Sequence, residues 1–360
     1  MLIFLSNAFF WGLIKHAAAV VIFAAVLTIL LFKFFILNAR VKEGAKNILL
    51  LTWSFAFLFL LFELIFTFIP YSNGGKRVTH ATLLWKYYYW NPVNSLLYRD
   101  TELNKKDTSK IKVFFLGDSF TAGHGIKRVK DRVSENMNSL CSNCTSYNLG
   151  LNGSDTKDEY SRLLKYSIKP DIIVFQHFAN DIDKAASHNG IFYNFQLKSE
   201  DYSIKGRIIK KSCFINYFYW KFTHEFRAND YVDYIDKAYH SEKAIAEHFS
   251  DLDSIITYAK RNSIELYVLI YPLLNSNPND PVNGYTKIIA GHFSENNIPV
   301  LNVGDLINKK DISIEKRIVN NNDPHPSPLL NEAVALELSE LIKINQKKNL
   351  EKENKINWGE

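Results

Sequence analysis

The chain has 360 residues, which is enough for one large domain with additional segments. Its formal net charge is only +6, and its basic residues are scattered rather than gathered in a stripe, which argues against nucleic acid as a partner. It has no Walker loop, no dinucleotide-binding fingerprint and no paired Cys/His set for zinc. We therefore expect neither an organic cofactor nor a metal.

Two apolar stretches near the N-terminus, 17–37 and 48–69, are each about as long as a bilayer-spanning helix. Neither shows a polar face, which argues against two core helices. The first is too long for a typical signal peptide and lacks a convincing cleavage site. We therefore predict a membrane anchor of two helices in residues 1–70. Glu63, in the second stretch, is interpreted as an interfacial or protonated acid, with a functional intramembrane acid as the alternative.

The loop between the two stretches carries three basic residues, Arg40, Lys42 and Lys46. Fewer basic residues flank the pair on its other side, so the positive-inside rule places this loop in the cytoplasm. We expect an integral protein of a bacterial-type inner membrane, with the remainder of the chain facing the periplasm or the cell exterior.

Residues 71–110 form a juxtamembrane linker that alternates between polar and aromatic residues, as in the run from Trp85 to Trp90. Three roles remain open for these aromatic side chains. They could form an interfacial belt, they could stack on a sugar, or they could pack the linker onto the following domain. Packing is the simplest of the three.

Residues 111–343 alternate between candidate strands and candidate helices. The predicted strands are 112–116, 146–149, 171–176, 265–270 and 300–303, and the predicted helices are 129–140, 157–166, 242–261, 284–295 and 328–342. This alternation predicts a three-layer α/β/α fold with a parallel sheet covered on both faces. The run at 171–176 is apolar at successive positions, as expected for a strand buried on both sides.

Two further segments fall outside that alternation. The insertion 184–240 carries an aromatic stripe at helical spacing that includes Phe214, Tyr217 and Phe218. It predicts a small subdomain or a lid, with a membrane-touching amphipathic helix as the alternative. The tail 344–360 is charged and low in apolar residues, which predicts a solvated segment.

A serine follows the first predicted strand directly. Gly117 ends the strand, and Asp118 and Ser119 come next. A serine at the carboxyl end of a buried strand lies where α/β sheets carry their ligands, and Asn180 follows the strand 171–176 at the same edge. Gly-Asp-Ser alone would more often be a helix-capping turn. A nucleophilic serine also needs a histidine base and a group that orients it.

Those partners stand near the other end of the chain. Asp323 and His325 are two residues apart, on a segment stiffened by Pro324 and Pro326. This spacing lets the carboxylate contact the imidazole while the segment presents both.

Four motifs in this order resemble the SGNH/GDSL hydrolase superfamily, over roughly residues 111–342. They are Gly117-Asp118-Ser119, the stretch from Asn148 to Gly153, Asn180-Asp181 and Asp323-Pro324-His325. The resemblance implies a flavodoxin-like fold, a Ser119–His325–Asp323 catalytic triad, and an oxyanion hole made by Ser119, Gly153 and Asn180, with Gly117 and Asp118 in support. One departure is Ala179, where the family usually has glycine.

The three cysteines leave the redox state open. Cys141 and Cys144 have a spacing that fits either a tight local disulfide or two free thiols, and a disulfide would leave Cys213 unpaired.

The resemblance and the anchor together predict a membrane-anchored serine esterase or deacylase. Its substrate would be an ester-bearing carbohydrate or lipid of the cell envelope. An O-acyltransferase that moves an acyl group to an envelope glycan is one alternative, and a non-catalytic binding module is another. The motifs do not indicate whether the chain has a protein partner.

Overall fold

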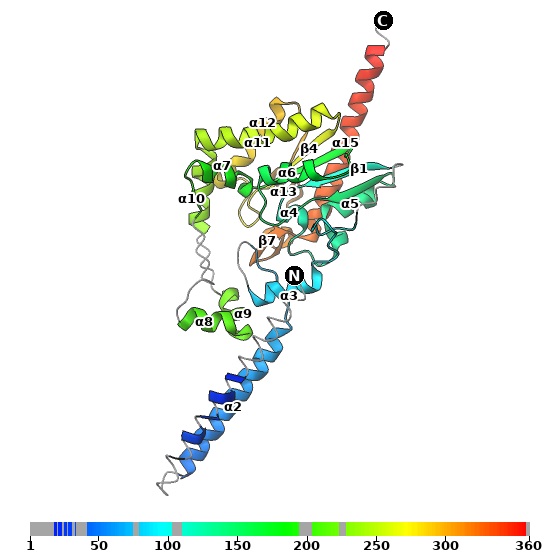
Figure 1. Cartoon of the computed structure of the whole chain (residues 1–360). Coiled ribbons are helices and arrows are strands. Elements are labelled where there is room, and N and C mark those ends of the chain that lie inside the picture. The colour runs from blue at the N-terminus through cyan, green and yellow to red at the C-terminus, as the bar shows by residue number, and fades with distance from the viewer. Residues whose placement is uncertain are drawn as a thin grey trace. The chain divides into compact units, whose positions relative to one another are not determined.

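The computed structural model describes residues 42–74, 79–102, 110–193, 204–222 and 228–357, together with isolated helical positions between residues 18 and 33 (Figure 1). The chain forms two compact units. We call Met1–Tyr88 with Phe195–Phe226 the anchor unit, and Tyr89–Asn194 with Arg227–Glu360 the sheet unit. The sheet unit thus begins in the aromatic linker, whereas the sequence suggested a boundary after residue 110.

The anchor unit is helical. It contains α2 (Lys42–Thr67), α3 (His80–Tyr89), α8 (Ile204–Lys211) and α9 (Cys213–Phe222). Within α2, Lys46–Thr67 has a mean hydropathy of 2.4 and is the one helix among the described residues that is long and apolar enough to cross a membrane. The first predicted span, 17–37, is described only at scattered helical positions, so the two-helix anchor stays a prediction.

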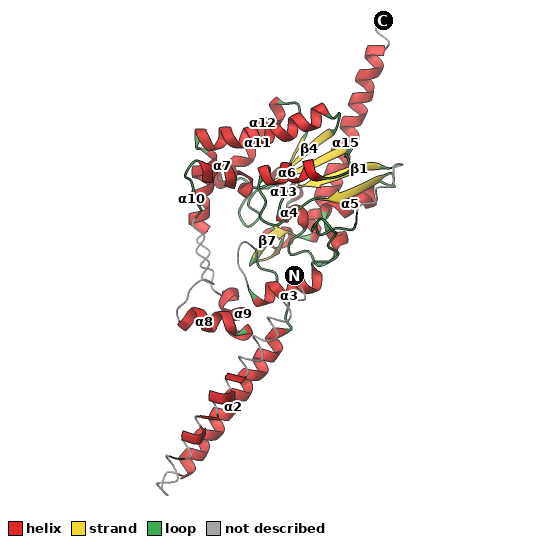
Figure 2. Cartoon of the chain, viewed as in Figure 1, coloured by secondary structure: helices red, strands yellow, loops and turns green. Residues whose placement is uncertain are grey.

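The sheet unit is built on a five-stranded parallel sheet with the strand order β2-β1-β3-β4-β5 (Figure 2). Its strands are β1 (Ile111–Leu116), β2 (Cys144–Asn148), β3 (Ile172–His177), β4 (Glu265–Ile270) and β5 (Val300–Asn302). The register pairs Phe115 of β1 with Asn148 of β2 and with Val174 of β3. This is the flavodoxin-like order, whose switch point lies between β1 and β3.

Helices cover both faces of the sheet, because successive strand residues point to opposite sides. Phe114 and Leu116 face α6 (Thr156–Lys165), α7 (Asp183–His188), α10 (Ala228–Tyr239), α11 (Glu242–Arg261) and α12 (Tyr285–Glu295). Val113 and Phe115 face α5 (Val133–Leu140), α13 (Val303–Lys310) and α15 (Pro328–Asn357). The predicted three-layer α/β/α fold is therefore confirmed.

Several predicted boundaries change in the structure. The helix expected at 129–140 is broken at Arg132, whose extended backbone separates the 3₁₀ turn η2 (Val129–Asp131) from α5. The strand expected at 300–303 ends at Asn302, because the Asn302 side chain caps α13 by accepting from the Gly304 N–H. The last helix continues to Asn357, well past the expected end at residue 342.

The short elements were not predicted. They are α4 (Ser119–Ala122), η3 (Ala179–Ile182), η5 (Pro281–Gly284), α14 (Ile314–Arg317), β6 (Ile318–Asn320) and β7 (Asp323–Pro326). β6 and β7 pair as an antiparallel hairpin. The segment that carries Asp323 and His325, expected to be a proline-stiffened loop, is thus a short strand with a hydrogen-bonded partner.

The predicted insertion 184–240 is divided between the two units. α7 and α10 belong to the sheet unit, whereas α8 and α9 belong to the anchor unit. Phe214 of α9 stacks on Phe62 of α2, with ring centroids 5.0 Å apart, and Phe218 lies 5.1 Å from Phe66. The aromatic stripe of the insertion therefore packs on the candidate span.

Candidate active site

Ser119 is the first residue of α4, directly after β1 and Gly117. The Asp118 carboxylate caps this short helix by accepting a hydrogen bond from the Phe120 N–H at 2.9 Å. The capping role that Gly-Asp-Ser most often has is therefore present as well. A side chain at Gly117 would place its Cβ 2.3 Å from Thr121 Oγ1 and 2.5 Å from Gln176 Oε1, so a larger residue would have to displace these two side chains. The half-buried Ser119 side chain remains accessible.

The hairpin β6–β7 brings the other two predicted residues to the serine. His325 Nε2 lies 2.8 Å from Ser119 Oγ. His325 Nδ1 contacts Asp323 Oδ1, and Asp323 is fully buried. Because the two residues are separated by one position on an extended strand, their side chains lie on the same face of β7. The structure thus joins the three residues in an unbroken series of hydrogen bonds.

The imidazole of His325 packs among aromatic rings. Phe120 meets it edge to face at 5.1 Å between ring centroids, and Phe120 itself stacks on Phe178 at 4.3 Å. These contacts limit the orientations open to the imidazole and keep water from most of its surface. Only 7% of His325 is exposed.

Asn180 lies in η3, just past the end of β3 and on the same edge of the sheet as Ser119. Its Nδ2 donates to the carbonyl of Ser154 at 3.4 Å. Gly153 precedes Ser154 in the loop after β2, at a φ of +75° that favours glycine. Ala179, the departure from the family pattern, is fully buried, and its carbonyl accepts from Tyr239 Oη at 3.2 Å. The extra methyl group is therefore accommodated.

A cluster of buried carboxyl groups lies behind this edge. Asp118, Glu159 and Asp181 are almost fully buried. Burial raises the pKa of Asp118, although the Phe120 N–H and the charge of His325 oppose it. Burial also raises the pKa of Glu159 and Asp181 well above their ordinary values, and the charge of nearby acids adds to this. Each of these carboxyl groups is therefore harder to ionise than a free carboxyl group in water.

His124 is a residue of this site that the sequence analysis did not single out. Its Nδ1 lies 3.0 Å from Asn152 Nδ2, which donates to it and leaves the proton on Nε2. Nε2 lies 3.8 Å from Asp323 Oδ2, the oxygen that does not face His325. The rings of His124 and His325 are 4.6 Å apart. The one sequence feature that could have indicated His124 is its position between Gly123 and Gly125, shortly after Ser119.

His124, Asp323 and His325 are also the one group among the described residues with the spacing of a metal site. In this arrangement, however, both nitrogens of His325 face Ser119 and Asp323. A cation bound by His325 would displace one of these contacts. The donor set therefore fits a proton-transfer chain better than a metal centre.

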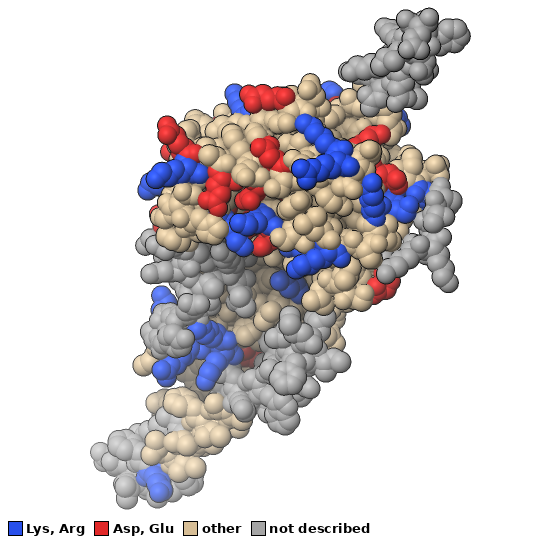
Figure 3. Space-filling model, turned by 45° about the horizontal axis from the view of Figure 1, so that its top comes forward, with Lys and Arg blue, Asp and Glu red and all other residues tan. Residues whose placement is uncertain are grey.

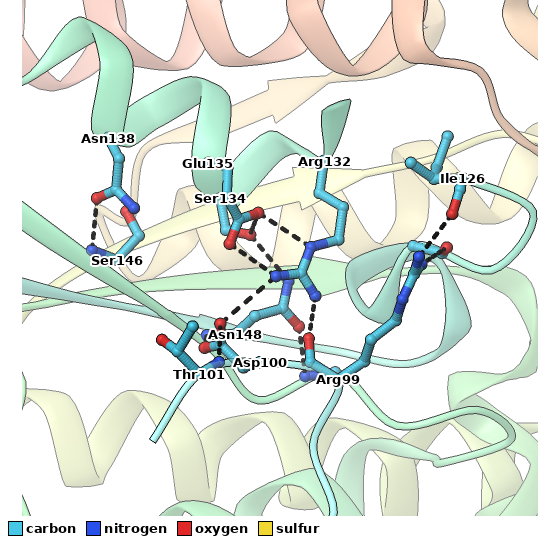
Figure 4. Close-up of polar contacts among 12 residues, drawn as sticks. Arg99, Asp100, Thr101, Ile126, Arg132, Ser134, Glu135, Asn138, Ser146 and Asn148 are labelled. Atoms are coloured by element: carbon cyan, nitrogen blue, oxygen red, sulfur yellow. Dashed lines mark hydrogen bonds and ion pairs between the residues drawn. The ribbon is translucent and has the colours of Figure 1, made fainter. Parts of the chain in front are cut away.

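Arg99 and Asp100 in the linker belong to a network of polar contacts that includes Ile126, Arg132 and Asn148 (Figure 4). The Arg99 guanidinium donates to the carbonyls of Gly123 and Ile126, which follow α4, at 2.6 and 2.7 Å. The Asp100 carboxylate accepts from the Asn148 N–H at 2.7 Å. Burial raises the pKa of Asp100 to about 6, while Arg132 opposes the shift. Arg99 and Asp100, in the part of the linker that begins at Tyr89, are thus buried within the sheet unit.

Arg132 and Asn148 complete this network. Arg132 contacts the Arg99 carbonyl and forms an ion pair with Glu135 at 2.6 Å. Asn148 Nδ2 donates to the Thr121 carbonyl at 2.7 Å and to Ser134 Oγ at 2.9 Å. Arg132, where the predicted helix is interrupted, thus connects the linker to α5 through its side chain.

Cys141 and Cys144 form a disulfide between α5 and β2, and Cys213 is buried with a free thiol. Of the two possibilities that the sequence left open, a local disulfide or two free thiols, the structure has the disulfide.

No family model and no curated protein matches this sequence. Among solved structures, the chain is similar to a member of the lipolytic protein G-D-S-L family from Veillonella parvula, with 14% identity, 64% of this chain and 97% of that chain covered, and a TM-score of 0.36.

It is also similar to Axe2, an acetylxylan esterase from Geobacillus stearothermophilus, with 15% identity, 65% and 94% covered, and a TM-score of 0.40. An acetyl xylan esterase, AlAXEase, gives 16% identity, 63% and 98% covered, and a TM-score of 0.39. At such low identities and TM-scores, these likenesses say nothing of the reaction that this chain performs.

Proposed function

We propose that this protein is a serine ester hydrolase that works through a covalent acyl-enzyme. The observation that carries the proposal is the continuous series from Ser119 Oγ to His325 Nε2 and from His325 Nδ1 to Asp323. A serine hydroxyl is a weak nucleophile, and an adjacent base that is itself oriented by a carboxylate is the arrangement that activates it.

In the proposed first step, Ser119 Oγ attacks the ester carbonyl carbon while His325 Nε2 accepts the hydroxyl proton. Asp323 stabilises the imidazolium and holds its tautomer. The tetrahedral intermediate then breaks its bond to the alcohol oxygen, which takes the proton from His325. Water attacks the remaining serine ester with His325 as base, releasing the acid and restoring Ser119.

The negative oxygen of the intermediate needs hydrogen-bond donors, and we assign these to the Ser119 N–H, the Gly153 N–H and Asn180 Nδ2. Support comes from their origin, since Ser119 and Asn180 follow neighbouring strands at the switch point of the sheet. Gly153 lies in the loop whose next carbonyl accepts from Asn180.

We further propose that the enzyme is anchored in a bacterial-type inner membrane with the sheet unit outside the cytoplasm. The apolar helix Lys46–Thr67 supports the anchor, and the basic residues at 40–46 support its orientation. The Cys141–Cys144 disulfide adds independent support, because such bonds persist in oxidising compartments. The expected substrate is an ester-bearing carbohydrate or lipid of the envelope.

An O-acyltransferase that uses a glycan hydroxyl in place of water is the alternative from the same chemistry. A non-catalytic binding module is the alternative from another class. The closed hydrogen-bond series argues against the module, since binding needs no activated serine.

The test is labelling of the detergent-solubilised protein with a fluorophosphonate, in parallel with turnover of p-nitrophenyl acetate. We expect both signals in the wild type and neither in Ser119→Ala. Ser139→Ala, at an exposed serine of α5, is the matched control and keeps both. Labelling without turnover would favour transfer to a specific acceptor. Absence of labelling in the folded wild type would contradict the catalytic proposal and favour the binding module.

A further inference from the structure

The hairpin of α8 and α9, residues 204–222, is fastened to the outer end of the candidate span. Glu63 of α2 accepts a hydrogen bond from the Cys213 N–H at 2.8 Å and also contacts Ser212 Oγ. The carboxylate thus binds the N-terminus of α9, where the helix dipole favours negative charge. Glu63 is 4% exposed. It is therefore an attachment point for the hairpin.

An aromatic cluster strengthens this attachment. Phe214 stacks on Phe62 at 5.0 Å and lies 5.4 Å from Phe66, while Tyr217 lies 4.9 Å from Phe66. Glu63 is four residues from the end of the span at Thr67, which corresponds to a rise of about 6 Å. If the span crosses a bilayer, the hairpin is held at the level where hydrocarbon meets the headgroups.

The exposed face of α8 has the pattern of an interfacial helix. Ile204 and Ile208, one turn apart, are 78% and 45% exposed. Arg207 and Lys211, also one turn apart, form the adjoining exposed row. Gly206 is buried and Ile209 is half-buried, so they form the packed side. Two exposed isoleucines beside a basic row are typical of helices that lie in a membrane surface.

All charged side chains of the hairpin are basic. Residues 204–222 contain five basic side chains, Lys205, Arg207, Lys210, Lys211 and Lys221, and no acidic one. In Figure 3, Lys and Arg side chains gather at this hairpin, whereas on the sheet unit blue and red side chains are interspersed. These residues are far from the span in sequence, so they do not enter the positive-inside balance.

We propose that α8 is an interfacial helix that binds anionic phospholipid headgroups. Ile204 and Ile208 enter the headgroup–acyl boundary, and Arg207 and Lys211 contact lipid phosphate. An acidic protein would also attract this charge, but it would not explain exposed isoleucines at the level of an apolar span. The inference depends on the anchor part of the proposed function and is independent of the esterase chemistry.

The test places a nitroxide label at Ile208→Cys in the full-length Cys213→Ser protein, in nanodiscs of neutral lipid with or without phosphatidylglycerol. Collision with oxygen, which partitions into lipid, is compared with collision with a water-soluble nickel chelate. Phe57→Cys, 66% exposed on α2, is the lipid reference, and Leu164→Cys, 54% exposed on α6, is the water reference.

We expect position 208 to resemble the lipid reference, more strongly when phosphatidylglycerol is present. Adding Arg207→Gln and Lys211→Gln should remove about half or more of this lipid dependence. A label at 208 that resembles the water reference in both nanodiscs would overturn the proposal. A water-like label at position 57 would overturn the anchor as well, whereas esterase turnover, measured on the same samples, reports separately on the catalytic proposal.

Discussion

Two polar clusters at the carboxyl edge of the sheet differ in the groups to which their charged side chains bond. Ser119, His325 and Asp323 are joined in series and end at a half-buried hydroxyl. Arg99 and Asp100 are buried and bond mainly to backbone groups. The first arrangement delivers a proton acceptor to one accessible atom. The second holds the backbone that carries Ser119. We therefore expect substitutions in the first cluster to change kcat and substitutions in the second to change the free energy of unfolding.

The largest expected effect is on catalysis. Asp323→Asn should lower kcat about 10⁴-fold, because the amide favours the wrong tautomer of His325 and no longer stabilises the imidazolium. Turnover of p-nitrophenyl acetate measures it. Asp311→Asn, at the end of α13, is the control and should leave kcat unchanged. A fall of less than tenfold in the Asp323 variant would mean that this carboxylate does not orient the base.

Arg99→Met should act on stability instead. Arg99, 1% exposed, donates to the carbonyls of Tyr89, Gly123 and Ile126. Each buried carbonyl left without a donor costs roughly 1–3 kcal/mol, so we expect the free energy of unfolding to fall by about 3 kcal/mol or more. For a unit of this size the Tm should fall by about 6–12 °C.

Arg128→Met is the matched control for that variant. Arg128 is 65% exposed and pairs with Asp131 at 2.7 Å, and exposed ion pairs contribute at most about 1 kcal/mol. Equal Tm changes in the two arginine variants would mean that the buried contacts of Arg99 stabilise the fold no more than an exposed ion pair does.

Asn180→Ala tests the oxyanion donors. Loss of one such donor should lower kcat by about 10²–10³-fold with little change in KM, because the interaction forms in the transition state. Asn189→Ala is the control, since Asn189 donates to the Ala185 carbonyl outside the site. An effect confined to KM would show that Asn180 binds substrate in the ground state only.

His124→Phe should have a smaller effect on kcat than Asn180→Ala. The variant keeps an aromatic ring beside His325 but removes the Nε2–H that faces Asp323. The Nε2–Oδ2 separation of 3.8 Å is longer than a hydrogen bond, so kcat should fall by at most about fivefold. His292→Phe, a ring stacked on Phe249 away from the site, should leave kcat unchanged. Identical kcat in both variants would exclude a role for His124.

The smallest effect concerns pH. Burial raises the pKa of Glu159, so the folded state binds its proton more tightly than the unfolded state does. The resulting stabilisation is present below the unfolded pKa of about 4.3 and is lost as the pH rises through the folded pKa. Relative to wild type, Glu159→Gln should therefore gain Tm as the pH rises from 5 to 8. A constant difference in Tm would contradict the raised pKa.

The sheet, and the residues that meet at its edge, could be predicted from the amino-acid sequence. The strands are continuous apolar runs, and a parallel sheet buried on both faces requires such runs, so their approximate places were readable. Ser119, Asp323, His325 and Asn180 were identified from local motifs. The segment 323–326 was expected to be a loop but pairs with β6 as a strand, and the helix expected at 129–140 is interrupted at Arg132, whose side chain contacts the Arg99 carbonyl in the linker.

The polar groups that contact those residues could not be predicted from the sequence and are seen only in the folded chain. His124 faces Asp323 across about 200 residues of chain, and Arg99 holds the loop after Ser119 from the linker. The Glu63 carboxylate meets the N-terminus of α9 about 150 positions further along. No local pattern encodes such pairs, because a buried charge selects its partner through the packing of the whole unit rather than through spacing in the sequence.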